Sequence, residues 1–107
     1  HFQCFSQKIY IKKINLLKQE NKEYAQLLHK DYTFTVAHVV WAVREEMAQT
    51  VEDVLARRVR LLFLDARVAA EVAPMVASIM AKELCKDRNW EEEQITEFRS
   101  LAKGYIL

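Results

Sequence analysis

The chain has 107 residues, of which 51% are hydrophobic and 29% are charged, and its formal net charge is +1. This length predicts one domain over residues 1–107, and the near-neutral charge excludes a global field that would steer nucleic acid. One Gly and one Pro are too few for the frequent turns of a β-sandwich or barrel, so we expect an all-α fold.

The first third of the chain predicts one helix and a loop. Residues 1–7 are apolar without a clear period, so we expect them to be irregular. Apolar residues at helical spacing predict a helix over 9–20, then a break or a second short helix over 21–29. Residues 31–34 are typical of a loop. Six Lys and three acidic residues over 1–34 make this part mildly basic, which we interpret as solvated helix surface.

Two capped helices are predicted in the middle of the chain. Thr35 is a suitable N-cap for a helix over 36–47. Thr50, followed three residues later by Asp53, predicts a capping box at the start of a second helix that continues to about residue 62. The expected inner face of the first of these helices consists of Val36, Val39, Val40, Val43 and Met47.

The longest predicted helix begins after Asp65 and continues to Cys85. Pro74 lies inside it and cannot donate to the carbonyl of Ala70, so we expect a kink there and a free carbonyl that needs another donor. Its expected apolar positions are Val68, Val72, Met75, Val76, Ile79, Met80 and Leu84.

A last helix is predicted after a loop over residues 86–89. We expect Glu91 to be its N-cap, with Trp90 packed onto Ile95, and the helix to end near Gly104. Its expected inner face is Ile95, Phe98, Leu101, Ala102 and Tyr105. Together these elements predict a single compact bundle of five to six helices.

Five polar residues near the middle of the chain form the clearest motif, namely Glu46, Thr50, Asp53, Arg57 and Arg58. Asp53 and Arg57 are spaced as a favourable ion pair on a helix. An inward pair of Glu46 with Arg58 would fix how the two middle helices cross, which is a matter of specificity more than of stability. We assign these five residues a structural role and no catalytic one.

Signatures of catalysis, metal binding and cofactor binding are missing from the sequence. A single Gly rules out the glycine-rich loops that bind dinucleotides or phosphate. His29 and His38 fall on different elements and lack a third ligand, so no metal site is expected. Cys4 and Cys85 are distant and are interpreted as free thiols. The longest uncharged run, over residues 32–43, is too short to span a bilayer.

A helix-turn-helix interpretation of residues 36–62 is the main nucleic-acid alternative. Its second helix carries Arg57, Arg58 and Arg60. However, a recognition helix presents base-reading side chains near its N-terminus, where here Glu52 and Asp53 would repel phosphate. We therefore expect no nucleic-acid partner.

The segment 39–58 resembles the C-terminal domain motif of the FAD-dependent respiratory glycerol-3-phosphate dehydrogenases and the related glycerophosphate oxidases. The core of this motif is Glu-Asp-Val-Leu-Ala-Arg-Arg over 52–58, followed by Phe-Leu-Asp-Ala-Arg over 63–67 and Ala-Pro over 73–74; the similarity covers roughly residues 32–105. Two positions depart from the family. His38 stands where Glu is usual, which places a capping box at Thr35 in question, and Cys85 replaces an expected Gly, which implies a less tight turn.

The resemblance implies that the parent enzyme oxidises sn-glycerol 3-phosphate to dihydroxyacetone phosphate. Its electrons would pass to FAD and then to a quinone, or to oxygen in the oxidases. The flavin-binding and substrate-binding residues belong to the N-terminal part of such enzymes. This chain starts at His1 without Met, so we expect a C-terminal fragment with no catalytic residue and no cofactor of its own.

The implied partner is the N-terminal flavin-binding part of the parent chain. The resemblance also implies a cytoplasmic location, with the parent peripheral on the inner face of a membrane, and leaves homo-oligomerisation open. The alternative interpretation is a free-standing helical protein-interaction module.

Overall fold

The all-α prediction is confirmed by a computed structural model, which describes the backbone of residues 2–106 and the side chains of residues 11–106. In this part of the chain the only β-type pairing is an isolated bridge between Leu27 and Thr35. The helical elements are α1 (Phe2–Glu20), η1 (Lys22–Ala25), α2 (Val36–Glu45), η2 (Asp53–Arg58), α3 (Leu61–Leu64), α4 (Ala66–Leu84) and α5 (Arg88–Lys103).

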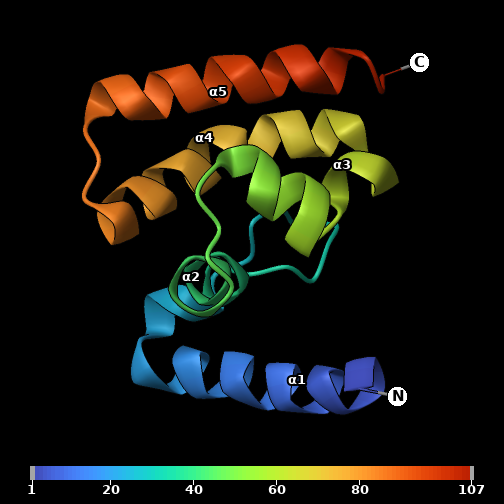
Figure 1. The fold of residues 1–107 in the computed structure, drawn as a ribbon, viewed down its shortest axis with the longest axis vertical. Coiled ribbons are helices and arrows are strands. Elements are labelled where there is room, and N and C mark those ends of the chain that lie inside the picture. The colour runs from blue at the N-terminus through green and yellow to red at the C-terminus, as the bar shows by residue number, and fades with distance from the viewer. Residues whose placement is uncertain (1, 107) are drawn as a thin grey trace.

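The helices are stacked along the longest axis of the molecule in the order α5, α4, α2 and α1 (Figure 1). α4 packs against both α5 and α2, so it is the central helix, and α1 contacts α2 at the far end. Small side chains allow this close approach, since Ala69, Ala73 and Ala77 of α4 are fully buried. The largest fully buried side chains of the core are Phe98, Leu55, Leu61, Met80, Val39, Val40, Val51, Val54 and Val76.

The N-terminal helix is longer than the sequence predicts. The expectation of irregular structure over 1–7 is wrong for residues 2–7, because α1 already begins at Phe2; residue 1 lies outside the described residues. No Gly or Pro interrupts the stretch 2–20, so the backbone has no reason to leave the helix. The predicted break is confirmed: α1 ends at Glu20, and the side chain of Asn21 accepts a hydrogen bond from the Glu23 amide at 2.9 Å to begin η1.

Helix α2 begins after Thr35, as predicted, but ends earlier than expected. Val36, Val39 and Val40 are buried, whereas Met47 is 80% exposed. Placing Met47 on the inner face is therefore wrong. The helix ends at Glu45, and Met47 itself adopts a left-handed conformation with φ 60°, which turns the chain away from the helix axis.

His38 acts as the N3 residue of a capping box at the start of α2. The Thr35 amide donates to Nδ1 of His38 at 3.0 Å, and the Thr35 hydroxyl lies 3.0 Å from the same nitrogen. A neutral imidazole with an unprotonated Nδ1 therefore replaces the usual Glu. Burial of the ring, and to a lesser degree the charge of Lys18, lowers the pKa of His38 from 6.5 to about 4.

This histidine makes stability depend on pH. The unfolded chain has the higher pKa, so between about pH 6.5 and 4 it binds more protons than the folded chain. The contribution of His38 to the free energy of unfolding is fully present above about pH 6.5. It should fall on the order of 2 kcal/mol as the pH drops towards 4, after allowance for the partial exposure of the ring. Urea melts across this range should show a flatter dependence for His38→Gln, which keeps an acceptor but does not titrate. Parallel curves for the two proteins would contradict the assignment.

The predicted single helix over 51–62 is wrong, because the chain breaks into two short helices. The Val59 amide bonds to the Val54 carbonyl at 2.9 Å, and η2 has the wide turns of a π-helix. Arg60 then adopts a left-handed conformation with φ 59° before α3 begins. With this break, apolar residues on both sides of it, 54–56 and 61–62, are buried in the same core.

The long helix α4 begins and ends where the sequence predicts. The carboxylate of Asp65 accepts from the Val68 amide at 3.2 Å. The helix continues through Pro74, and the carbonyl of Ala70 receives the predicted outside donor, Nε of Arg99 on α5 at 3.3 Å. Pro74 thereby contributes to the pairing of α4 with α5. The kink stays a prediction.

Cys85 closes α4 in the backbone conformation that favours glycine. Its φ is 58° and its ψ 46°, and the following amide, of Lys86, bonds to the Ala81 carbonyl at 2.9 Å. The expectation of a looser turn without Gly is therefore wrong. Cys85 is also exposed, as a free thiol, and the side chain of Cys4 lies outside the described residues.

Cys85→Gly should stabilise the protein. A residue with a Cβ pays a steric cost in the left-handed region, so glycine should add about 1 kcal/mol to the free energy of unfolding. Urea melts under reducing conditions measure the gain, and Cys85→Ala is the matched control because it keeps the Cβ. A gain of the same size in the alanine variant would point to the thiol rather than the backbone.

Helix α5 begins four residues earlier than expected. Asp87, rather than Glu91, is its N-cap, and the Asp87 carboxylate accepts from the Trp90 amide at 2.9 Å. An Asp in this position competes well with a Glu for capping, because its short side chain reaches the amides of the first turn. Phe98 is buried as predicted, whereas Tyr105 lies past the end of α5 and is exposed.

Candidate functional site

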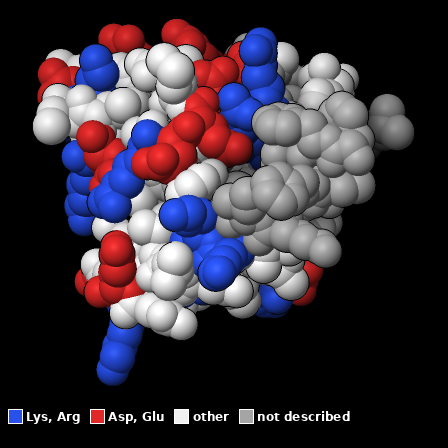
Figure 2. Space-filling model, turned by 60° about the horizontal axis from the view of Figure 1, so that its bottom comes forward, with Lys and Arg blue, Asp and Glu red and all other residues white. Residues whose placement is uncertain are grey.

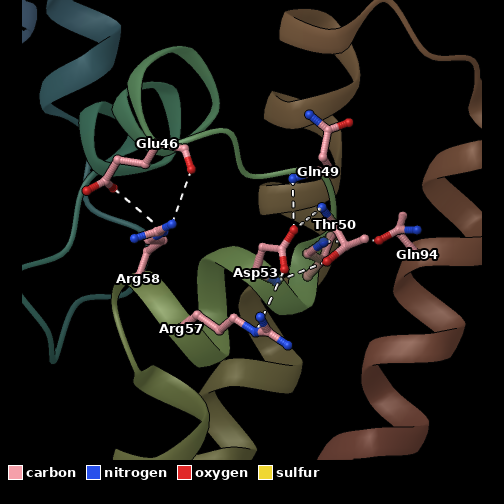
Figure 3. A network of polar contacts seen from close by, with 8 residues as sticks. Glu46, Gln49, Thr50, Asp53, Arg57, Arg58 and Gln94 are labelled. Atoms are coloured by element: carbon pink, nitrogen blue, oxygen red, sulfur yellow. Dashed lines mark hydrogen bonds and ion pairs between the residues drawn. The ribbon is translucent and has the colours of Figure 1, made fainter.

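Thr50 and Asp53 form the reciprocal capping box that the sequence predicts (Figure 3). The Asp53 amide donates to the Thr50 hydroxyl at 3.0 Å, while the Asp53 carboxylate accepts from the Thr50 amide at 3.2 Å. The same carboxylate oxygen also accepts from the Gln49 amide at 2.9 Å. Asp53 therefore holds the backbone that leads into η2 as well as the first turn itself.

The two arginines of the motif form exposed ion pairs at the surface of the domain. Nε of Arg57 lies 3.9 Å from Oδ1 of Asp53. Nε of Arg58 lies 4.0 Å from Oε1 of Glu46, and its Nη2 donates to the Glu46 carbonyl at 3.2 Å. The expected inward pair of Glu46 with Arg58 is wrong, because the Arg58 side chain is 43% exposed. The pair still ties the end of α2 to η2, but through the backbone carbonyl and at a partly exposed position (Figure 3).

Gln94 is a partner that sequence reasoning missed. Its Oε1 accepts from the Val51 amide at 3.0 Å and so satisfies a donor of the first turn after Thr50. Gln94 comes from α5, 43 positions away in the chain. An isolated Gln on a charged helix carries no local signal for such a contact, and only its position on the side of α5 that faces the capping box reveals it (Figure 3).

A second polar tie joins α2 to α4 and η1. Nε of Arg44 donates to Oε1 of Glu83 at 2.6 Å, and its Nη2 donates to Oε2 of Glu83 at 3.3 Å and to the Tyr24 hydroxyl at 3.2 Å. The pKa of Arg44 is raised, chiefly by the hydrogen bond to Glu83. Two-point binding of a carboxylate is a geometry that Arg provides and Lys cannot.

The loop before α2 is held against α4 in a similar way. Nε2 of His29 lies 3.3 Å from Oε2 of Glu71, and the Tyr32 hydroxyl donates to Oδ2 of Asp65 at 3.1 Å. His29 and His38 are in separate environments, and no group of three or more metal-ligating side chains occurs among the described residues. The polar groups collected here hold helices and loops together.

Charged side chains are mixed on the face around the N-terminal helix. Figure 2 shows Lys and Arg interspersed with Asp and Glu on this face, with no continuous basic surface in the part that is coloured. Such a mixture is typical of a solvated surface rather than of a track for a phosphate backbone. The absence of a nucleic-acid partner stays a prediction.

Two surface hollows complete the candidate sites. One, of about 540 Å³, is lined by Asn89, Glu92, Glu93, Thr96 and Glu97 of α5. The other, of about 340 Å³, lies between α3 and the C-terminal end of the described chain and is lined by Leu62, Phe63, Leu64, Asp65, Ala66, Arg67, Tyr105 and Ile106. Neither lining includes a Ser, Cys or His, and the carboxylates that line the hollows have no such nucleophile beside them in either lining.

A family model described as the C-terminal domain of alpha-glycerophosphate oxidase matches residues 10–95. The chain belongs to this family. The match includes the capping box, both arginines of the motif, α4 with Pro74, and Gln94. The resemblance read from residues 52–58 and 63–67 is thereby confirmed.

Curated relatives are named as glycerol-3-phosphate dehydrogenases. The mitochondrial glycerol-3-phosphate dehydrogenase of Schizosaccharomyces pombe is 36% identical over 76 residues, which cover 71% of this chain and 11% of that protein. The probable mitochondrial enzyme of Dictyostelium discoideum is 33% identical over 90 residues, covering 84% of this chain and 13% of that protein. The probable enzyme of Caenorhabditis elegans is 48% identical over 59 residues, or 55% of this chain and 8% of that protein.

The chain therefore spans only about a tenth of the length of these relatives. No solved structure gives a significant match. Among the described helices, none is both long and apolar enough to cross a membrane.

Proposed function

We propose that this chain is the non-catalytic C-terminal domain of an FAD-dependent glycerol-3-phosphate dehydrogenase. The parent protein would oxidise sn-glycerol 3-phosphate to dihydroxyacetone phosphate and pass the electrons to FAD and then to a quinone. The observation that carries the proposal is the family match over residues 10–95, together with relatives named for this activity.

The FAD of such a parent would bind outside this chain. A dinucleotide is usually held by a glycine-rich turn between a strand and a helix. The sequence has a single Gly, Gly104, and it follows the end of α5 instead of a strand. The residues present do not fit a flavin pyrophosphate, so we derive no chemical step from them.

We infer a structural role for Glu46, Thr50, Asp53, Arg57 and Arg58 in this domain. Their hydrogen bonds go to backbone amides, to a backbone carbonyl and to one another, which supports the inference. A group that reacts with substrate would be expected to line a hollow, and none of the five lines either hollow described above.

We further propose that the domain packs on the flavin-binding part of the parent, and that the parent lies peripherally on a membrane. The names of the relatives place those proteins in mitochondria. For a eukaryotic source, this supports a mitochondrial membrane instead of the cytoplasmic location that the resemblance implies. Homo-oligomerisation of the parent would involve surfaces outside this domain or the apolar residues that it leaves exposed.

A free-standing helical interaction module is the second candidate. The observation that favours it is a group of exposed apolar residues, Phe63, Leu64 and Tyr105. Such a group suits any helical partner protein, whereas the family match ties the chain to one kind of enzyme.

A domain exchange tests the proposed function. The matched C-terminal region of the Schizosaccharomyces pombe relative would be replaced by this chain, and sn-glycerol 3-phosphate oxidation and bound flavin would be measured. We expect the chimera to retain flavin and activity well above a variant from which the region is deleted. A chimera no better than the deletion would overturn the proposal and favour the interaction module, as would stoichiometric FAD binding by the free chain.

A further inference from the structure

Three of the exposed large apolar side chains that the structure describes come together at α3. Phe63, Leu64 and Tyr105 are 54%, 64% and 48% exposed, and all three line the hollow of about 340 Å³. Phe63 and Tyr105 meet edge to face, with ring centroids 5.5 Å apart. We call these three residues the Phe63 patch. Large apolar side chains that cluster around a hollow mark an interaction surface more often than single exposed ones do.

The backbone presents this patch outward at two points far apart in the sequence. The left-handed conformation of Arg60 ends η2 and starts α3, which buries Leu61 and Leu62 and leaves Phe63 and Leu64 facing solvent. Tyr105 arrives from the end of α5. Two separate segments therefore supply one edge-to-face aromatic pair, which suits an anchor in a partner's pocket.

The charge around the patch is positive. The guanidinium of Arg60 lies 5.8 Å from the centroid of the Phe63 ring, and it forms no ion pair with any side chain that the structure describes. Arg67 lines the hollow. The carboxylate of Asp65 also lines the hollow, where it accepts from the Val68 amide and the Tyr32 hydroxyl, so two arginines lie beside one carboxylate. A partner that complements this surface would offer an apolar centre and carboxylates at its edge.

From this arrangement we infer that the Phe63 patch docks on an apolar, acid-rimmed surface of the flavin-binding part of the parent protein. The inference rests on the proposed function, in which about nine tenths of a relative's length lies outside the matched region. A second copy of this chain fits the patch less well, because two-fold pairing through it would bring the arginines of both copies to one interface.

Hydrogen exchange in the chimera described above tests this inference. In the free chain α3 is a single turn at the surface, so its amides should exchange fast. Docking should slow exchange over 61–67 and 103–106 by about tenfold or more and leave 11–20 unchanged. Phe63→Ser with Tyr105→Ser should abolish the protection. Ile11→Ser with Leu16→Ser removes two exposed apolar side chains from α1 and should leave the protection intact.

The outcomes separate the surface from the function. Protection confined to other segments, in a chimera with flavin and activity, would overturn the docking surface and leave the proposed function standing. Protection nowhere, in a chimera whose helical signal is intact and whose activity equals that of the deletion, would overturn both. Sedimentation equilibrium of the free chain should show a monomer, and a dimer abolished by Phe63→Ser would assign the patch to a second copy instead.

Discussion

Phe98→Ala should lower the free energy of unfolding by about 4 kcal/mol, the largest single effect expected in this protein. Phe98 is 2% exposed and is the largest fully buried side chain among residues 11–106. On α5 Phe98 and Ala102 are buried, and Trp90, Ile95 and Leu101 pack against the core while only partly buried, so Phe98 is the largest single contribution of this helix to the core. Truncation would leave a cavity between the two helices and loosen α5.

Phe63→Ala is the matched control for this prediction. It removes the same atoms from a ring that is more than half exposed, and it should cost less than about 1 kcal/mol. Urea melts of both variants, monitored by helical circular dichroism, give the comparison. Similar losses in the two would mean that Phe98 is not the anchor of α5.

Asp53→Ala should cost about 2 kcal/mol, whereas Arg58→Ala should cost about 0.5 kcal/mol. The Asp53 carboxylate accepts from two backbone amides, and its loss leaves the Thr50 amide, which is partly buried, without that acceptor. Arg58 forms a long, half-exposed ion pair and one hydrogen bond to a carbonyl that water can also reach.

Glu52→Ala provides the control for charge alone, since Glu52 is an exposed acid next to Asp53 in the same turn. Its loss should stay within about 0.5 kcal/mol. Thermal and urea melts at one pH rank the three variants. A larger loss for Arg58→Ala than for Asp53→Ala would contradict this ranking and support the buried ion pair that the sequence predicts and the structure does not show.

Local capping signals in the sequence predicted three of the helix starts. Thr35, Thr50 and Asp65 all cap the helices expected of them, because a short polar side chain before an apolar run acts within one turn. The donor required by the Ala70 carbonyl was also foreseen from Pro74, although its identity, Arg99, was not. These features depend on neighbours along the chain, which a sequence displays directly.

The errors in the middle of the chain fall where tertiary packing overrides local preference, whereas the starts of α1 and α5 were misjudged from local features. The break at Arg60 has no Gly or Pro to announce it, and it follows from burying apolar residues on both sides of the break. Gln94, in the same way, is defined by the packing of α5 beside the capping box. The inward Glu46–Arg58 pair failed because it assumed that a regular helix continues through 51–62, whereas the wide turns of η2 change the direction of each side chain.

The five-residue motif around Asp53 and the Phe63 patch have different roles in the domain. Asp53 and its partners fix where η2 begins, and η2 determines where Arg60 turns the chain into α3. The motif thus affects the proposed docking surface through the backbone. Asp53→Ala should weaken docking because it lowers the stability of the domain, since Asp53 is not part of the docking surface.

The central claim is that this domain contributes structure and no chemistry to a glycerol-3-phosphate-oxidising enzyme. The most direct test is the steady-state kinetics of the chimera carrying Asp53→Ala, expressed per mole of bound flavin, at a temperature well below its melting point. The account predicts a lower melting temperature with kcat and KM within about twofold of the parent chimera. A loss of kcat of about tenfold or more, with flavin and fold retained, would place the motif in the reaction and contradict the account.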